Sequence, residues 1–246
     1  MYVETYIKQM TMIKTSRRIM TGALILFVMA CKNAPDSAIA EIGDAKEVAT
    51  ANAAETLPID VIASKLEWIG TKLSTYHSGT VNIKSGEMRV ADGKLAGGQF
   101  VMDMPTLVTT SMDAAGNKKL TGHLMSPDFF DVVKYPEAKF EITSVVPFSG
   151  KSAIAVDTMK EISKYAVADP NVTISGNLTI KDITKNISFP AKITVNKSDV
   201  YAVAKFNIDR KQWNLVYPGM PDDLIQDLIW FGISIKANSI ADNALK

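Results

Sequence analysis

The sequence predicts an all-β protein, built as a closed antiparallel barrel of eight strands. From Lys65 onward, short stretches of two-residue hydrophobic alternation are separated by Gly, Asn and Asp, which is the pattern of an antiparallel sheet. Long helical patterns are missing from this region. The chain has 246 residues and is 47% hydrophobic, so it can bury one large core.

Apolar side chains recur at every second position in the first three predicted strands: Leu66 and Trp68, then Val81 and Ile83, then Phe100, Met102 and Met104. Between the second and third of these strands, Asp92-Gly93 is a dipeptide favoured in tight hairpin turns. The three strands therefore begin an antiparallel meander.

The same alternation continues in the second half of the chain. It is clearest over residues 172–180, continues over 187–195 and 202–208, and ends in a last strand over 227–237. A meander of this kind leaves two open edges unless it closes on itself, and eight strands close with room for one small ligand. In the last strand Trp230 lies on the face opposite the apolar one, where we expect it to pack under a loop, cover an edge or join a subunit contact.

Residues 118–140 carry an unusual number of aromatic rings for a connecting segment, namely Phe129, Phe130, Tyr135 and Phe140. Ser126-Pro127-Asp128 has the pattern of a helix start, with Ser126 as the N-cap and Pro127 at the first helical position. Tyr135-Pro136 then favours an extended exit. We therefore predict a short helical segment in the loop around 118–136, with its rings buried at the mouth of the barrel.

A second connecting segment, residues 149–170, contains DTMKEISKYA, in which apolar residues fall at helical spacing. A short amphipathic helix is predicted here. It would either decorate a turn or shield one opening of the barrel.

The N-terminus has the pattern of a lipoprotein signal peptide over residues 1–30. Lys14, Arg17 and Arg18 precede an apolar run too short to span a bilayer comfortably, and the run ends in Val28-Met29-Ala30-Cys31, which resembles a lipobox. Cys31 is the only cysteine, so it has no partner for an intramolecular disulfide. We expect an exported protein of the cell envelope, anchored to a membrane through a lipidated Cys31.

Residues 31–56 are rich in Ala, Asp, Glu and Asn and have few large apolar groups. This composition predicts a flexible tether, with a short helix as the alternative. The folded barrel domain is then expected over residues 57–240.

The sequence offers little catalytic or metal-binding chemistry. It has two histidines, His77 and His123, and no cysteine beyond Cys31, so the common zinc sets cannot be assembled without several carboxylates. Phosphate-binding glycine loops and the usual hydrolase and metalloprotease motifs are absent. With a formal net charge of +1, the chain gives no sign of a nucleic-acid partner. We predict no enzyme activity, no metal site and no cofactor.

The segment GHLMSPDFFDVVKYPEAKF closely resembles the signature segment of the YceI-like family, lipocalin-like bacterial proteins that bind polyisoprenoid lipids. Other pieces match in the family's order: SKLEWIGTKL, HSGTVNIKSGEM, GGQFVMDM, SGNLTIKDITKNISFPAKI and FNIDRKQWNL. The resemblance covers roughly residues 57–238, although residues 149–170 are longer than the family's usual turn. It implies a polyisoprenoid, either an isoprenoid quinone or a polyprenyl phosphate, stored or carried inside the barrel.

The inward faces of the predicted strands supply ten candidate contacts for such a lipid: Leu66, Trp68, Phe100, Met102, Phe140, Ile142, Leu178, Phe189, Phe206 and Ile208. The candidate head-group contacts are His77, Asp103, His123 and Arg210. His123 can alternatively brace the aromatic loop. Arg210 can alternatively stack on Trp213 and fix the end of the barrel, rather than contact a phosphate.

Two other functions remain open on the residues alone. The barrel can be filled by its own side chains and display its loops to an envelope partner, or it can be an enzyme acting on an apolar substrate. A homodimer is also considered, because the outer face of the last strand is not fully polar.

Overall fold

The computed structural model describes residues 34–48, 54–150 and 164–238. The expected signal peptide, Cys31 and most of the predicted helix at 157–166 lie outside these residues. None of the helices in the described ranges is both long and apolar enough to cross a membrane.

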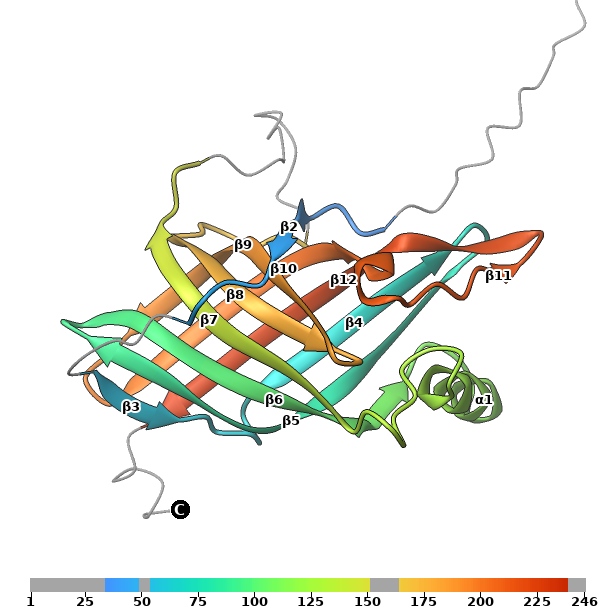
Figure 1. Cartoon of the computed structure of the whole chain (residues 1–246), viewed down its shortest axis with the longest axis horizontal. Coiled ribbons are helices and arrows are strands. Elements are labelled where there is room, and N and C mark those ends of the chain that lie inside the picture. The colour runs from blue at the N-terminus through green and yellow to red at the C-terminus, as the bar shows by residue number, and fades with distance from the viewer. Residues whose placement is uncertain (1–33, 49–53, 151–163, 239–246) are drawn as a thin grey trace, which may run out of the picture. The chain divides into compact units, whose positions relative to one another are not determined.

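Eight antiparallel strands form a closed barrel, as predicted (Figure 1). In chain order they are β4 (Lys65–Lys72), β5 (Tyr76–Ala91), β6 (Lys94–Thr109), β7 (Glu137–Pro147), β8 (Val172–Ile180), β9 (Ile183–Val195), β10 (Asp199–Asp209) and β12 (Asp223–Asn238). Each strand pairs with the next, and β12 returns to pair with β4. The β9–β10 ladder, with Ala191 opposite Ala204, joins two of these neighbours, so the meander has no open edge.

The hairpin turns follow the turn chemistry of the sequence. Asp92 and Gly93, between β5 and β6, both have positive φ, at 51° and 69°. Lys181 and Asp182, between β8 and β9, do the same at 48° and 59°. Two consecutive residues with positive φ are what a two-residue type I′ hairpin requires.

One α-helix is found in the described part of the chain, and it begins earlier than predicted. Helix α1 spans Ala114–Met125, and the side chain of Asp113 caps its first turn by accepting a hydrogen bond from the Gly116 amide at 2.7 Å. Ser126, predicted as an N-cap, instead ends the helix, with its amide and its hydroxyl both donating to the His123 carbonyl. The prediction of a helix start at Ser126 is therefore wrong, and the aromatic segment after it is a series of turns.

The prediction of a flexible tether is wrong for residues 34–48, here called the N-terminal arm. Within the arm, β1 (Ala38–Ile39) pairs in parallel with β10, and β2 (Glu41–Asp44) pairs with β9. A further short strand, β3 (Glu55–Pro58), pairs with β5. The arm has few large apolar side chains, and the barrel holds it mainly through backbone ladders and asparagine side chains. β3 in addition buries Leu57 in the core.

Asn177 and Asn207 provide most of these side-chain contacts. Asn177 Oδ1 accepts from the Lys46 amide at 3.0 Å, and its Nδ2 donates to the Lys46 carbonyl at 2.6 Å. Asn207 Nδ2 donates to the Pro35 carbonyl at 2.9 Å. A polar arm can therefore be held on the barrel wall without burying much apolar surface.

Trp230 packs under a loop, which was one of the three alternatives that the sequence left open. Its indole Nε1 donates to the Tyr165 carbonyl at 2.9 Å, and the two rings meet edge-on at 5.5 Å. This contact attaches the end of the 149–170 connection to the outside of β12.

Candidate ligand-binding cavity

The inside of the barrel is hollow. A cavity of about 350 Å³ lies between the inward faces of all eight strands, and its wall is overwhelmingly apolar. Small-ligand sites in proteins have this size and this apolar character, with a few polar groups that fix orientation. The barrel therefore encloses a ligand-sized space and is not filled by its own side chains.

Nine of the ten predicted lumen residues line this cavity: Leu66, Trp68, Phe100, Met102, Phe140, Ile142, Leu178, Phe189 and Phe206. Ile208 also points away from solvent, at 1% exposure, but it does not reach the cavity. Its position shows that alternation along a strand gives the direction of a side chain and not the extent of the hollow.

A continuous row of phenylalanine rings crosses the cavity wall from β6 to β12. Phe100 lies 5.4 Å from Phe140, which lies 5.8 Å from Phe189. Phe189 stacks on Phe206 at 4.0 Å with planes 12° apart, and Phe206 meets Phe231 at 6.2 Å. The row combines large apolar area with rigid side chains, which suits a long apolar ligand.

Small side chains provide the space beside this row. Ala191 and Ala204 face each other across the β9–β10 ladder and both line the cavity. On β8, Gly176 accommodates the Phe140 ring, because a Cβ at this position would lie 2.3 Å from Phe140 Cζ. A larger residue at Ala191 or Ala204 would take volume from the cavity, and one at Gly176 would displace the Phe140 ring in its wall.

One end of the cavity reaches the surface, and we call this end the mouth. Met220, on the short strand β11 (Gly219–Met220), lines the cavity and is also 59% exposed. The end of α1 and the turns after it form another part of the mouth, through Leu124, Phe129 and Phe130. The aromatic segment therefore lies at the barrel mouth, as its rings predicted.

His123 braces this part of the mouth and also lines the cavity. Its ring meets Phe129 edge-on at 5.2 Å and Tyr217 edge-on at 4.8 Å, and Phe129 and Tyr217 lie 5.3 Å apart. Its Nε2 lies 3.4 Å from a carboxylate oxygen of Asp128. These contacts join α1 to the segment before β11. Tyr217 was not among the predicted site residues, since it lies in a loop without any periodic pattern.

His77 lies at the same end, as the second residue of strand β5, and lines the cavity. Its Nδ1 is 3.4 Å from the Ser111 hydroxyl. Burial, together with the positive charge of Lys72, lowers the pKa of His77, and Asp223 opposes this shift. His77 therefore presents a neutral imidazole to the cavity near neutral pH.

Asp103 does not join the other head-group candidates. It lies on β6 between Met102 and Met104, which line the cavity, so its side chain points to the outer face of the barrel. Its strand neighbours there are Asn82 and Glu137. The structure therefore brings together His77, His123 and Arg210, and it leaves Asp103 outside.

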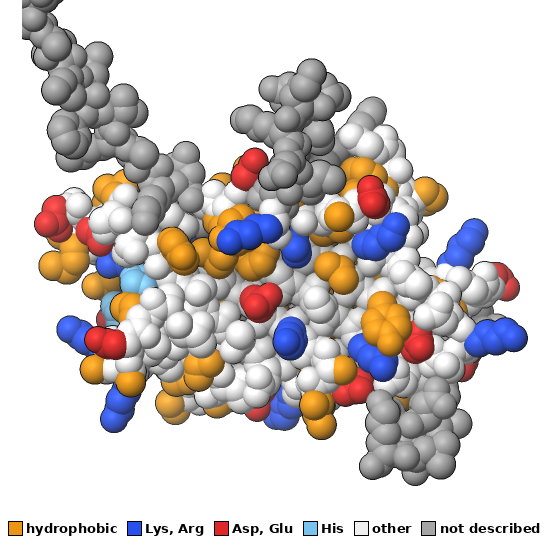
Figure 2. All heavy atoms as spheres, turned by 180° about the vertical axis from the view of Figure 1, so that it is seen from behind, with side chains coloured by type: hydrophobic (Ala, Val, Ile, Leu, Met, Phe, Trp, Pro, Cys, Tyr) orange, Lys and Arg blue, Asp and Glu red, His pale blue; other side chains and the backbone are white. Residues whose placement is uncertain are grey.

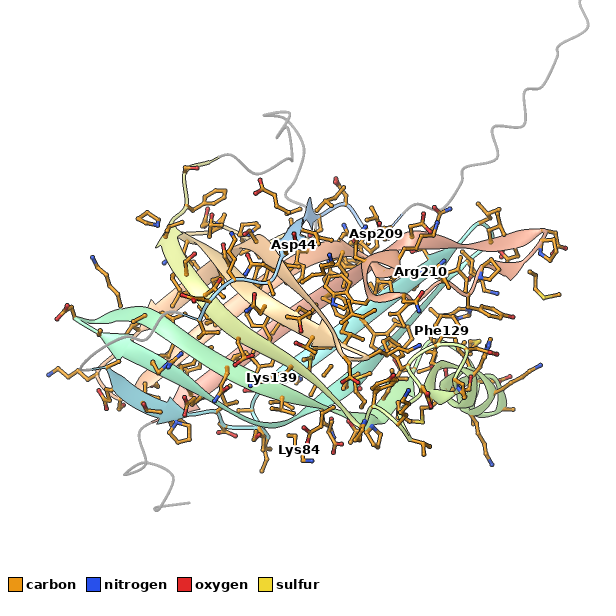
Figure 3. The ribbon with its side chains drawn as sticks, in the orientation of Figure 1. Asp44, Lys84, Phe129, Lys139, Asp209 and Arg210 are labelled. Carbon is orange, nitrogen blue, oxygen red and sulfur yellow. The ribbon has the colours of Figure 1, made fainter. Side chains whose placement is uncertain are left out.

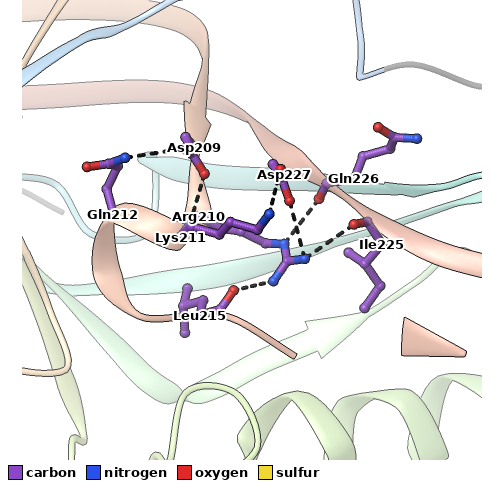
Figure 4. Close-up of polar contacts among 8 residues, drawn as sticks. All are labelled: Asp209, Arg210, Lys211, Gln212, Leu215, Ile225, Gln226 and Asp227. Carbon is purple, nitrogen blue, oxygen red and sulfur yellow. Dashed lines mark hydrogen bonds and ion pairs between the residues drawn. The ribbon is translucent and has the colours of Figure 1, made fainter. Parts of the chain in front are cut away.

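Arg210 lies at the wall of the cavity and is 1% exposed (Figures 3 and 4). Its Nε donates to the Gln226 carbonyl at 3.1 Å, its Nη2 to the Ile225 carbonyl at 3.2 Å, and its Nη1 to the Leu215 carbonyl. The carboxylate of Asp227 is 3.7 Å from Nη2. Burial lowers the pKa of Arg210, and Asp227 partly offsets this effect.

The local strand geometry explains these contacts. The β12–β4 ladder shifts register between Ile225 and Ile229, and two of the three carbonyls that Arg210 contacts, those of Ile225 and Gln226, lie in this irregular stretch. Trp213, in the short 3-10 helix η1 (Arg210–Trp213), is fully buried and donates from Nε1 to the Leu178 carbonyl at 3.0 Å. The expected stacking of Arg210 on Trp213 is replaced by separate hydrogen bonds from each side chain to the main chain.

Comparison with known proteins agrees with this architecture. The structure is similar to that of Burkholderia cenocepacia BcnA, with a TM-score of 0.54 and 17% identity, over 73% of this chain and 99% of that one. It is also similar to a polyisoprenoid binding domain from Saccharophagus degradans implicated in plant cell wall breakdown, with a TM-score of 0.50 and 12% identity, over 74% of this chain and 97% of that one. At these identities the likeness concerns the fold. No curated protein matches the chain.

The family model of the YceI-like domain matches residues 58–237, which comprise the whole barrel from the end of β3 nearly to the end of β12. The chain therefore belongs to the YceI-like domain family.

Proposed function

We propose that this protein binds a polyisoprenoid lipid inside its barrel and stores or carries it in the cell envelope. The observation that carries the proposal is the apolar cavity of about 350 Å³, with one end at the surface. The family membership and the structural likeness to a polyisoprenoid binding domain support the same class of ligand. The proposed role is binding, without a catalytic step.

The energetics of the cavity suit a long isoprenoid tail. Each methylene moved from water into an apolar environment contributes about 0.8 kcal/mol, so several isoprene units bind tightly with little polar help. Met88, Met102 and Met104 are part of the wall, and flexible methionine side chains adapt to a slender ligand of variable shape.

Of the two expected head groups, we favour the uncharged one, as in a quinone. The cationic side chains of the cavity wall already have partners: Lys72 pairs with Asp223 at 3.3 Å, and Arg210 donates to three carbonyls. His77 is neutral near neutral pH because its pKa is lowered. A phosphate would have to displace one of these partners, whereas a carbonyl oxygen requires a single donor.

We further propose that residues 1–30 direct export and that Cys31 carries the lipid anchor. The basic residues, the apolar run and the Val28-Met29-Ala30-Cys31 sequence support this part of the proposal. Globomycin treatment of cells expressing the chain, followed by mass measurement, should show an uncleaved and diacylated precursor. A precursor that is cleaved normally under this treatment would contradict lipidation.

A matched pair of variants tests the binding function. Ala191→Phe adds a ring inside the cavity, and Lys192→Phe adds the same ring one position along β9, on the exposed outer face. Added isoprenoid quinone at about 100 times its Kd should stabilise the parent and Lys192→Phe by about 2.7 kcal/mol in urea unfolding. Ala191→Phe should gain much less. Equal stabilisation of all three proteins would show that the lipid does not occupy the lumen.

The alternative, an interaction module with a filled barrel, is less compatible with the hollow interior. It predicts that Ala191→Phe is destabilised by overpacking, by about 1–3 kcal/mol, and that no lipid stabilises the parent.

A further inference from the structure

Two turns at the mouth are joined into a single projection, which we call the tip. The tip consists of the β4–β5 turn and the β11–β12 hairpin. Asp223 joins them, because its carboxylate accepts from the Ser74 amide at 3.1 Å, from the Ser74 hydroxyl at 2.9 Å and from Lys72 Nζ at 3.3 Å. The Leu73 amide also donates to the Leu224 carbonyl at 3.2 Å. Although desolvation acts in the opposite direction, the bonds from Ser74 and Lys72 lower the pKa of Asp223, so the link is charged near neutral pH.

This tip presents large apolar side chains to solvent. Leu73 is 37% exposed, Tyr76 50%, Met220 59% and Leu224 45%. Single exposed apolar residues are common on protein surfaces, but these four lie on two turns that are hydrogen-bonded to each other. Figure 2, which views the barrel from behind, shows hydrophobic side chains beside the histidines at the end of the molecule that carries the mouth.

The apolar tip is continuous with the apolar cavity. Met220 belongs to both, and Gly219 and Ile225, on the same hairpin, line the cavity wall. A lipid that leaves or enters the cavity at the tip therefore meets an apolar surface. This continuity matters because exposing one five-carbon isoprene unit to water costs about 4 kcal/mol, at 0.8 kcal/mol per carbon.

The attachment of the N-terminal arm favours a bilayer as the surface that covers the tip. The Pro35 carbonyl is held by Asn207 on β10, and β1 pairs with Phe206 and Asn207 directly after it. Only three residues lie between Cys31 and Pro35 in the sequence, and the four Cα-to-Cα steps that join them span at most about 14 Å. A lipid anchor at Cys31 would thus hold the barrel wall near Asn207 close to the membrane surface.

The distance along the barrel wall from Asn207 to the tip is of the same order as the reach from Pro35 to Cys31. Asn207 lies opposite Trp230 in the β10–β12 ladder, and Trp230 is six residues from Leu224 along β12. Six strand residues span about 20 Å. The anchor and the tip can therefore contact the same bilayer at the same time, which a long flexible tether would not have favoured.

We propose that the tip formed by Leu73, Tyr76, Met220 and Leu224 docks on the lipid bilayer, so that the ligand passes between the hydrocarbon layer and the cavity without crossing water. This inference rests on the function proposed above. Asp222, at the turn of the hairpin, is exposed and acidic. Docking is therefore driven by apolar contact and needs no anionic lipid.

The experiment uses the full chain with Cys31→Ala, so that an acyl anchor does not contribute. Binding to phosphatidylcholine vesicles is measured by sedimentation, and the transfer of isoprenoid quinone from the vesicles into the protein is followed over time. The test variant is Leu73→Glu with Leu224→Glu, because both side chains are exposed at the tip and neither lines the cavity. The control is Ile62→Glu, which adds a charge at an apolar residue that is 92% exposed in the β3–β4 turn, at the end of the barrel opposite the mouth.

The proposal expects the double variant to lose vesicle binding and to take up quinone from vesicles at least tenfold more slowly, while Ile62→Glu behaves like the parent. Uptake from detergent micelles should be the same for all three proteins, which also shows that the variants are folded. The proposal is overturned if the parent does not sediment with vesicles, if both variants lose binding equally, or if the double variant only converts a dimer into a monomer. Tip-dependent vesicle binding without any uptake from micelles would leave docking intact and reject the lipid-binding function instead.

Discussion

Replacing Asn177 with alanine should release the N-terminal arm from the barrel wall. The Asn177 side chain takes part in three hydrogen bonds, two with the main chain of Lys46 at 3.0 and 2.6 Å and one with Asn186 Nδ2 at 3.1 Å. The two bonds to Lys46 hold the arm directly. At about 1 kcal/mol each, they contribute about 2 kcal/mol, which is roughly a 30-fold change in the equilibrium between docked and released arm.

Hydrogen exchange measured by mass spectrometry tests this prediction. In Asn177→Ala, the amides of β2, Glu41–Asp44, should exchange about 30-fold faster than in the parent, while amides in the ladders far from the arm change little. Asn196→Ala is the control, because Asn196 makes one side-chain bond to Asp199 in the exposed β9–β10 turn. Equal β2 exchange in the parent and in Asn177→Ala would refute the claim that these bonds hold the arm.

Three further predictions concern the barrel and its mouth. Arg210→Met leaves three carbonyls without their donor and should lower the free energy of unfolding in urea by about 3 kcal/mol or more. The control Lys211→Ala removes an exposed ion pair with Asp227 and should lower it by less than about 1 kcal/mol. Similar losses in the two variants would contradict a structural role for the buried guanidinium. Because the pKa of His77 is lowered in the folded protein, the stability that its neutral form provides is complete above the unfolded pKa of about 6.5 and is lost as pH falls below it towards the folded pKa. His77→Gln should therefore flatten the dependence of urea stability on pH in that window, and an unchanged slope would be inconsistent with the shift. Gly176→Ala places a Cβ 2.3 Å from the Phe140 ring and should destabilise the folded protein by about 1–3 kcal/mol. The control Gly43→Ala places a Cβ with nothing within 4 Å and should be nearly neutral. If Gly43→Ala lowered the thermal unfolding temperature more than Gly176→Ala, this packing would be ruled out.

Much of the barrel could be predicted because the alternation of apolar and polar residues within each strand shows which of its faces is buried. The alternation of Ile174, Gly176 and Leu178 with polar neighbours determines which face of β8 points inward, whatever the partner strand is. By the same rule, nine of the residues predicted to face the lumen line the cavity. The rule also predicts Ile208 as a lumen residue, because a local pattern contains no information about where the hollow ends.

The tether prediction was wrong for the N-terminal arm because it depended on contacts between residues far apart in the sequence. Lys46 and Asn177 are separated by 131 positions, and an asparagine in a strand does not indicate that it will bind a distant backbone. The arm therefore has the composition of a tether although the barrel holds it.

The helix start was mistaken for a different reason. The prediction rested on Ser126 alone, because a proline follows it, although Asp113 is an equally good N-cap residue. In the structure Asp113 caps the helix and Ser126-Pro127 ends it. A proline that follows a helix and a proline that begins one give the same local pattern, and only the preceding residues distinguish them.

Native mass spectrometry of the full chain, purified from a bacterial host without organic solvent, tests the central claim most directly. The account predicts one isoprenoid lipid per chain, present in the parent and in Lys192→Phe and missing from Ala191→Phe. A parent that carries no lipid, and that takes up neither added isoprenoid quinone nor added polyprenyl phosphate, would contradict the account.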